Sequence, residues 1–195
     1  YGIKIQVRRG AEKDMAQLAQ DILSSRGKLD DSVWAKEVVA QVYESGPIRL
    51  WDELRGAEDK WAVLEEVSFE EIRIGKEAGL RKLDGGVSVT RYAEAGKSIK
   101  NHVAMDTRAW KKFLKDQQKL GWNLVQGELH HKKIEGHGEA DARSVFSFVG
   151  HLERAEPRAR RMVEGLVEVA WSRDKDAQGH YLPRLLRTLE FTLKD

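Results

Sequence analysis

Two segments near the C-terminal end, Met162-Val-Glu-Gly-Leu-Val-Glu-Val-Ala-Trp171 and Leu185-Leu-Arg-Thr-Leu-Glu-Phe-Thr-Leu-Lys194, decide the predicted fold. A strand that buries one face places apolar residues at every second position. In the first segment valines alternate with glutamates. In the second, leucine and phenylalanine alternate with threonine, glutamate and lysine. Both segments are therefore predicted to be strands.

Two further strands are predicted before these segments. Ser144-Val-Phe-Ser-Phe-Val149 is rich in β-branched and aromatic residues, which suit a pleated sheet, and a looser alternation runs from Trp122 to Leu129. Glycine, proline and aspartate dominate the connections over 135–140, 154–158 and 173–179, as tight reversals require. The simplest arrangement of these four consecutive strands is an antiparallel meander.

The segment 160–171 also has a helical alternative. Its apolar residues form a stripe at helical spacing, and Pro157 suits the first position of a helix. A helix here would give the chain from Val87 onward a β-α-β-β-α-β order, which is ferredoxin-like. Gly165 and the β-branched valines disfavour a helix interior, so the strand is the preferred interpretation. The residues of the stripe are Met162, Val163, Leu166, Val167 and Ala170.

The chain up to residue 66 is predicted to be mainly helical. Residues 2–8 alternate like a short edge strand, and an amphipathic helix follows over 14–26. A second helix begins at Asp31 or Ser32 and ends at Gly46-Pro47. A short apolar turn over 48–54 then leads to a third helix over 57–66.

The middle of the chain is predicted to contain two strands and one long helix. The strands cover 67–74, with a bulge between Glu70 and Glu71, and 87–92. Asp84-Gly-Gly86 is a strong turn signal, and residues 95–103 are predicted to be irregular. The long helix begins after Asp106 or Thr107, and Gly121 ends it.

Together these elements predict one α+β domain over 1–195, mainly helical over 1–66 and sheet-rich over 67–195, with a helix over 106–120. A helical layer packs on a curved antiparallel meander with one long central helix. The order of helices, two strands, one helix and four strands resembles the cone-shaped folds of the nuclear transport factor two type. That resemblance implies a strongly bent sheet that wraps a helix and can enclose a pocket, but it implies no function.

Composition excludes several classes of function. The 195 residues include no cysteine, which excludes disulfides, thiol catalysis and cysteine-ligated zinc or iron–sulfur sites. The net charge of +2 gives no bulk electrostatic argument for nucleic acid. There is no run of about 18 apolar residues and no visible signal peptide, so we expect a soluble chain without a membrane span. Because the chain begins at Tyr1 rather than Met, we expect a processed protein or a piece of a longer one.

A histidine group in the sheet-rich part was considered as a metal site. His130 and His131 are adjacent, so on a strand they point to opposite faces and do not share a metal. His131 and His151 could meet across a hairpin, with a glutamate as third ligand. Ordinary polar residues on a sheet surface are the simpler interpretation, and no metal site is predicted. The histidine group also includes His137, and the candidate glutamate ligands are Glu128 and Glu153.

Gly96-Lys97-Ser98 resembles the end of a phosphate-binding loop. The full motif needs a glycine five residues before Gly96, and Arg91 stands there instead. We therefore predict no phosphate-binding loop, and the sequence assigns no cofactor and no catalytic residue.

A basic patch runs from Arg91 to Lys133, with ten basic and four acidic residues and hence a local charge of +6. It could contact RNA phosphates, an acidic protein or a lipid surface, although a solvated helix face is the simpler interpretation. Trp51 lies between charged neighbours and is a candidate anchor for a partner, with a core position as the alternative. The predicted partner or anion contacts are Arg108, Lys111, Lys112, Lys115, Lys119 and Trp51.

Three hypotheses for function follow. The first is a non-enzymatic macromolecule-binding or accessory module of a larger protein or assembly, because no catalytic signature is present. The second is a small-pocket hydrolase or isomerase with a His/Asp or Tyr/Asp pair, for which Tyr92, His102, Asp106 and Glu153 are candidates. The third is an RNA-associated role through the basic patch. A protein partner or parent chain is expected, and nucleic acid is not favoured.

Overall fold

The computed structural model describes residues 41–96, 99–135 and 142–195. The described residues belong to one compact unit, Ala40–Asp195. Several predicted features lie outside the described residues: the strand over 2–8, the helix over 14–26, the start of the second helix, His137, and Lys97 and Ser98 of the Gly-Lys-Ser segment.

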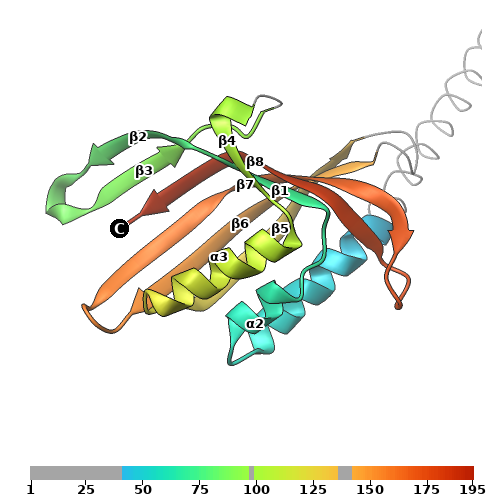
Figure 1. Cartoon of the computed structure of the whole chain (residues 1–195), viewed down its shortest axis with the longest axis horizontal. Coiled ribbons are helices and arrows are strands. Elements are labelled where there is room, and N and C mark those ends of the chain that lie inside the picture. Colours follow the sequence, from blue (N-terminus) through green and yellow to red (C-terminus); the bar gives the residue numbers. More distant parts are fainter. Residues whose placement is uncertain (1–40, 97–98, 136–141) are drawn as a thin grey trace, which may run out of the picture. The chain divides into compact units, whose positions relative to one another are not determined.

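Eight strands form one largely antiparallel sheet, and a few helices accompany it, which confirms the α+β, mostly-sheet prediction (Figure 1). Six of the strands follow the order β2-β3-β8-β7-β6-β5, and β1 pairs with both β4 and β8. The strands are β1 Glu71–Gly75, β2 Glu77–Lys82, β3 Ser88–Tyr92, β4 His102–Met105, β5 Trp122–Glu135, β6 Arg143–Arg154, β7 Ala159–Lys175 and β8 Tyr181–Lys194.

The predicted meander is confirmed, because β5, β6, β7 and β8 pair in sequence order and antiparallel. The helical alternative for 160–171, and with it the ferredoxin-like order, is wrong, because the segment lies within β7. Gly165 supports this strand by allowing a close approach to β8. A Cβ atom built there would lie 2.0 Å from the carbonyl oxygen of Glu190.

Two strands, β2 and β4, were not predicted. All six residues of β2 are exposed, so the strand has no buried face and no apolar alternation to mark it. The turn at Asp84–Gly86 that joins β2 to β3 was predicted, and Gly85 and Gly86 adopt φ angles of 82° and 83° there. The predicted bulge between Glu70 and Glu71 is wrong. Strand β1 begins only at Glu71, so Glu70 lies outside the strand.

A helix covers residues 41–56 without interruption, so the helix end predicted at Gly46-Pro47 is wrong. Proline removes one backbone hydrogen bond from a helix interior. Here the helix is anchored in the core on both sides of Pro47. Tyr43 before it and Leu54 after it are buried in separate core clusters. Tertiary packing therefore outweighs the local stop signal.

The two later helices match their predicted positions. Helix α2, Lys60–Glu65, begins at Asp59, whose carboxylate accepts from two backbone N–H groups. Helix α3, Thr107–Lys119, begins after Asp106, whose carboxylate accepts from the Ala109 N–H at 2.7 Å. Gly121 follows α3 with a φ of 82°, as a glycine after a helix C-terminus does.

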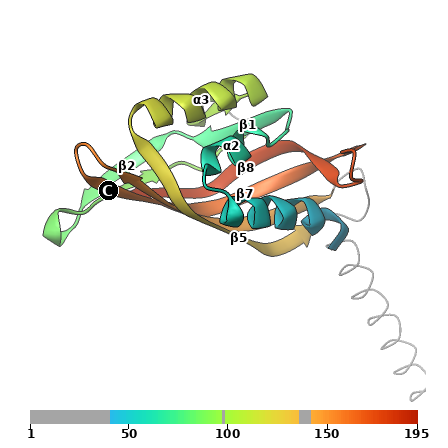
Figure 2. The same ribbon diagram turned by 90° about the horizontal axis from the view of Figure 1, so that it is seen from below.

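Helices α2 and α3 pack on one side of the sheet, which we call the inner face (Figures 1 and 2). Leu114 of α3 is only 1% exposed and packs with Trp122, Leu124 and Leu152. The indole N–H of Trp61 donates to the Trp122 carbonyl at 3.1 Å, which ties α2 to the start of β5. The opposite side of the sheet is called the outer face.

Candidate functional site

The register of four neighbouring strands builds a set of apolar side chains on the inner face. Val163 of β7 pairs with Leu193 of β8, and Gly165 pairs with Phe191. Because neighbours two residues apart share a face, these side chains lie together in two adjacent rows. Strand β3 extends the rows with Thr90 and Tyr92, and β6 extends them with Gly150 and Phe148. We define the trough as Tyr92, Phe148, Val163, Phe191 and Leu193 together with Gly150 and Gly165.

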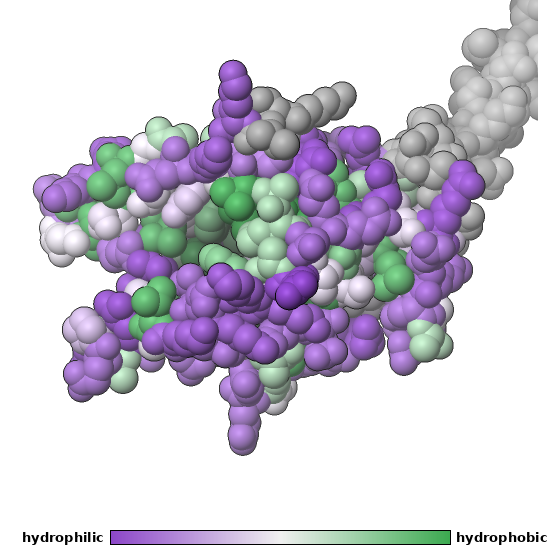
Figure 3. Space-filling view, in the orientation of Figure 1, coloured by the Kyte–Doolittle hydropathy of each residue, from purple (hydrophilic) through white to green (hydrophobic). Residues whose placement is uncertain are grey.

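Three aromatic rings run across the trough. The ring centroids of Tyr92 and Phe191 are 4.5 Å apart, and those of Phe148 and Phe191 are 6.0 Å apart. All three residues are half-buried, so part of each remains open to solvent. Figure 3 shows a hollow lined by hydrophobic side chains between the β2–β3 hairpin and α3, on this face of the molecule.

The two glycines give the trough its floor. A Cβ atom at Gly150 would lie 2.9 Å from Val163 Cγ2, and one at Gly165 would lie 3.1 Å from Phe148 Cζ. Side chains at either position would therefore push against the residues that line the trough. Because neither glycine has a side chain, Val163 packs against the backbone of Gly150 and the Phe148 ring packs against the backbone of Gly165. The surface is therefore lower at these two positions.

One end of the trough is charged. Arg161 lies two residues before Val163 on β7 and pairs through Nε with Asp195 at 2.5 Å. Its guanidinium group lies 4.3 Å from the centroid of the Trp122 ring. Burial raises the pKa of the Tyr92 hydroxyl, and the nearby carboxylates of Glu77 and Asp195 add to this rise while Arg161 opposes it. The Tyr92 hydroxyl is therefore influenced by Arg161 and Asp195, the two charged residues at this end of the trough.

Exposed apolar side chains border the same region. Leu80 of β2 pairs with Thr90 and is 57% exposed, and Leu83 and Val87 at the end of the same hairpin are also exposed. On α3, which packs on the same face of the sheet, Phe113 is 38% exposed. Apolar side chains gathered around a hollow are typical of interaction surfaces.

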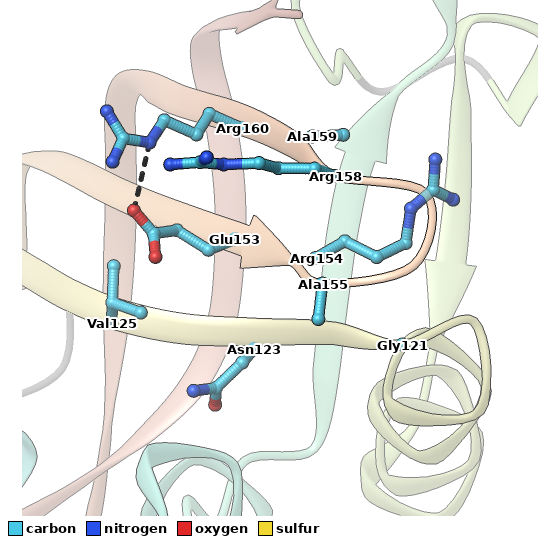
Figure 4. Close-up of a pocket in the computed structure, with 9 residues that line it drawn as sticks. All are labelled: Gly121, Asn123, Val125, Glu153, Arg154, Ala155, Arg158, Ala159 and Arg160. Carbon is cyan, nitrogen blue, oxygen red and sulfur yellow. Dashed lines mark ion pairs between the residues drawn. The ribbon is translucent and has the colours of Figure 1, made fainter.

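A second hollow, an open pocket of about 450 Å³, lies at the turn between β6 and β7 (Figure 4). Arg158 and Arg160 point the same way, and Arg154 is directed away from them. Arg160 pairs with Glu153 at 3.0 Å, and Arg154 donates to the Pro157 carbonyl at 3.3 Å. Two of the three guanidinium groups therefore already contact protein acceptors, which weakens this pocket as an anion site.

The basic residues predicted as contacts lie on α3, but several of them are paired. Lys112 and Lys119 both contact Asp116, at 3.6 and 3.4 Å, and Lys115 contacts Glu65 at 3.7 Å. Arg108 is exposed and Lys111 is half-buried on the same helix. Trp51 is half-buried, with its ring centroid 6.0 Å from that of His130.

His131 and His151 lie apart. His131 pairs with Phe146 across the sheet whereas His151 pairs with Gln126, so the two do not meet as a shared metal site would require. His131 instead contacts the carboxylate of Glu44. Within residues 41–96, 99–135 and 142–195, no group of three or more metal-ligating side chains occurs.

The four residues predicted as acid–base candidates lie on different elements. Tyr92 lines the trough on the inner face, whereas Glu153 lies in the pocket beside Arg160. Asp106 caps the start of α3, and His102 is buried on β4. A general acid and its partner base must reach the same reacting group, and Tyr92 and Glu153, on opposite faces of the sheet, do not.

Sequence patterns predict that Phe148, Phe191 and Arg161 lie in or beside strands, but they give no signal that these residues form one surface. The alternation of β8 was a sufficient signal that Phe191 and Leu193 share a face. The pairing of β3 with β8, which brings Tyr92 beside Phe191, was not predictable because these strands lie about 100 residues apart in the sequence.

No protein-family model, curated protein or solved structure matches this chain. Among the described residues, no helix is both long enough and apolar enough to cross a membrane.

Proposed function

We propose that this chain is a non-enzymatic binding module that holds an apolar segment of a partner protein in the trough. The observation that supports it is the row of half-buried rings of Tyr92, Phe191 and Phe148 on the inner face. Aromatic side chains of this kind supply much of the energy of protein interfaces. A partner segment would complete the burial that α2 and α3 leave unfinished there.

The openness of the trough favours a protein segment over a small molecule. Sites for small molecules enclose about 70–90% of the ligand surface. Here the lining rings are partly exposed, and the exposed side chain of Leu80, which pairs with Thr90, extends the apolar surface beyond the rings. A chain segment several residues long can contact the rings and this border at once.

We also propose that the fold is related to the nuclear transport factor two type. Two features support this: a meander of four strands forms most of the sheet, and α3 packs on its inner face through Leu114. In folds of that type the bent sheet wraps a long helix, so the inner face is where a ligand or partner would lie. An experimental structure that shows a flat sheet beneath α3 would contradict the relation.

The hydrolase or isomerase and RNA-associated hypotheses gain no comparable support. Tyr92 and Glu153, two of the acid–base candidates, lie on opposite faces of the sheet, and three lysines of the basic patch already contact Asp116 or Glu65. Neither hypothesis has a set of side chains that converge on one place as the trough residues do.

The test is selection of peptides from a random displayed library against the whole chain. We expect the selected peptides to carry leucine, isoleucine or phenylalanine at alternate positions, and to lose at least tenfold in affinity with the Leu193→Gln variant. The matched control is Leu166→Gln, because Leu166 is half-buried on the outer face of β7. Peptides that bind both variants equally well, or that contain no apolar residues, would contradict the proposal.

A further inference from the structure

We infer that the partner segment carries a carboxylate beside its apolar residues and that Arg161 binds this carboxylate. The inference rests on the proposed function, since it names the chemistry of the segment that the trough would hold. The trough has aromatic rings at one end and the guanidinium group of Arg161 at the other.

The sheet register places Arg161 at the end of the trough. Arg161 of β7 pairs with Leu152 of β6. Two residues further along β7, on the same face of the sheet, Val163 of the trough pairs with Gly150. Asp195 is held beside Arg161 by two backbone hydrogen bonds to Ser88, each of 3.0 Å. A segment that lies on Phe191, Leu193 and Val163 therefore reaches Arg161 within one further residue pair.

Arg161 is held in a fixed position. Its side chain is 26% exposed, and its guanidinium plane is stabilised by the Trp122 ring at 4.3 Å. The ion pair with Asp195 uses Nε. A guanidinium group has five N–H donors in a planar fork, so a second carboxylate can bind the terminal nitrogens while Asp195 keeps Nε.

The charges around Trp122 favour an added carboxylate. Arg154 also lies over the Trp122 ring, at 4.8 Å, so two guanidinium groups share one ring. Asp195 is the carboxylate that contacts one of them. Two guanidinium groups and one side-chain carboxylate therefore lie at this end, and one further carboxylate brings these charges closer to balance.

The experiment uses the tightest peptide from the library selection, synthesised once with its acidic residue and once with the matching amide. Fluorescence anisotropy gives the affinity of each version for the whole chain. We expect the acidic version to bind about tenfold more tightly, as a charge-assisted hydrogen bond allows, and the advantage to shrink as salt rises. Selected peptides without an acidic residue, or two versions of equal affinity, would overturn the inference.

Two variants separate binding by Arg161 from a general structural role. Arg161→Gln should remove the advantage of the acidic version and leave the amide version unchanged, while Arg158→Gln in the neighbouring pocket serves as the control. Asp195→Asn should strengthen binding of the acidic version by about threefold or more, because it removes a competing carboxylate. A gain is not expected from damage to the fold, so absence of this gain would overturn the inference even if Arg161→Gln fails to fold.

The outcomes also separate this inference from the proposed function. If Leu193→Gln weakens both peptide versions but Arg161→Gln changes neither, the trough binds a segment and the inference is wrong. If no selected peptide depends on Leu193, the proposed function is wrong. Dodecanoate and dodecanol are the probes for a free ligand, and Arg161-dependent binding of dodecanoate without any peptide binding would overturn the partner segment as the source of the carboxylate.

Discussion

The two faces of the same strands carry different chemistry. On the inner face β7 and β8 present Val163, Phe191 and Leu193, which line the trough. On the outer face the intervening residues form ion pairs, such as Lys194 with Glu164 at 2.6 Å. Period-two alternation thus separates a surface suited to an apolar partner from one suited to water. The contrast teaches that the trough, the proposed binding surface, is a part of the core face that the helices leave incompletely covered.

The largest effect is expected where the inner face is fully covered. Leu114→Ala should lower the free energy of unfolding by about 2–5 kcal/mol, because it leaves a cavity between α3 and the sheet. Chemical denaturation measures this change. The neighbouring Phe113→Ala serves as the comparison and should cost less than about 1 kcal/mol, since Phe113 is 38% exposed. Equal losses for the two variants would show that α3 does not pack as described.

A smaller effect is expected on the outer face, where Glu168 is the most buried charge. Its carboxylate side chain is 10% exposed and accepts from Arg187 at 3.0 Å, with Arg143 at 3.7 Å. Glu168→Gln should cost about 2 kcal/mol in unfolding free energy, below the full loss of a buried pair because Arg187 stays partly exposed. Glu164→Gln should cost about 0.5 kcal/mol or less, as exposed pairs do. A larger loss for Glu164 than for Glu168 would contradict this ranking.

The sequence was sufficient for the meander because its strands follow one another and each shows alternation or β-branched residues. It was also sufficient for α3, where Asp106 and Gly121 mark both ends. It failed at residues 46–47, where a local stop signal was outweighed by packing on both sides of Pro47. It failed for β2 because a strand exposed on both faces has no periodic pattern.

The trough could be predicted only in part. Alternation places Phe191 with Leu193, and β6 supplies Phe148 as its neighbour across Gly165. Tyr92 joins them only through the long-range pairing of β3 with β8, which sequence patterns do not specify. Which portion of the inner face the helices cover depends on where α2 and α3 lie in space, and helix stripes alone do not determine this.

The trough can also be monitored through the titration of Tyr92. Burial and the carboxylates of Glu77 and Asp195 raise its pKa above the ordinary value of 10.0, against the opposing effect of Arg161. A tyrosine whose pKa is raised on folding contributes stability that is fully present below pH 10.0, and this contribution is lost as the pH rises through the folded value. The ultraviolet absorbance titration of Tyr92→Phe, subtracted from that of the unaltered chain, should show the loss of one phenol that ionises above pH 10.0. A lost phenol that ionises at or below the ordinary value would contradict the assignment.

The smallest effect is expected on the outer side of α3, away from the trough. Lys111→Glu combined with Lys115→Glu should change the unfolding free energy by less than about 1 kcal/mol, because Lys115 is exposed and Lys111 is no more than half-buried, and charges at such positions contribute little. If the basic patch is only a solvated helix face, affinity for single-stranded RNA should not respond to this double reversal at any salt concentration. An RNA affinity that falls steeply with salt and disappears in the reversed variant would instead make α3 a second binding surface. The contrast between the two faces would then be incomplete, because the helix layer itself would carry a function that the sheet does not.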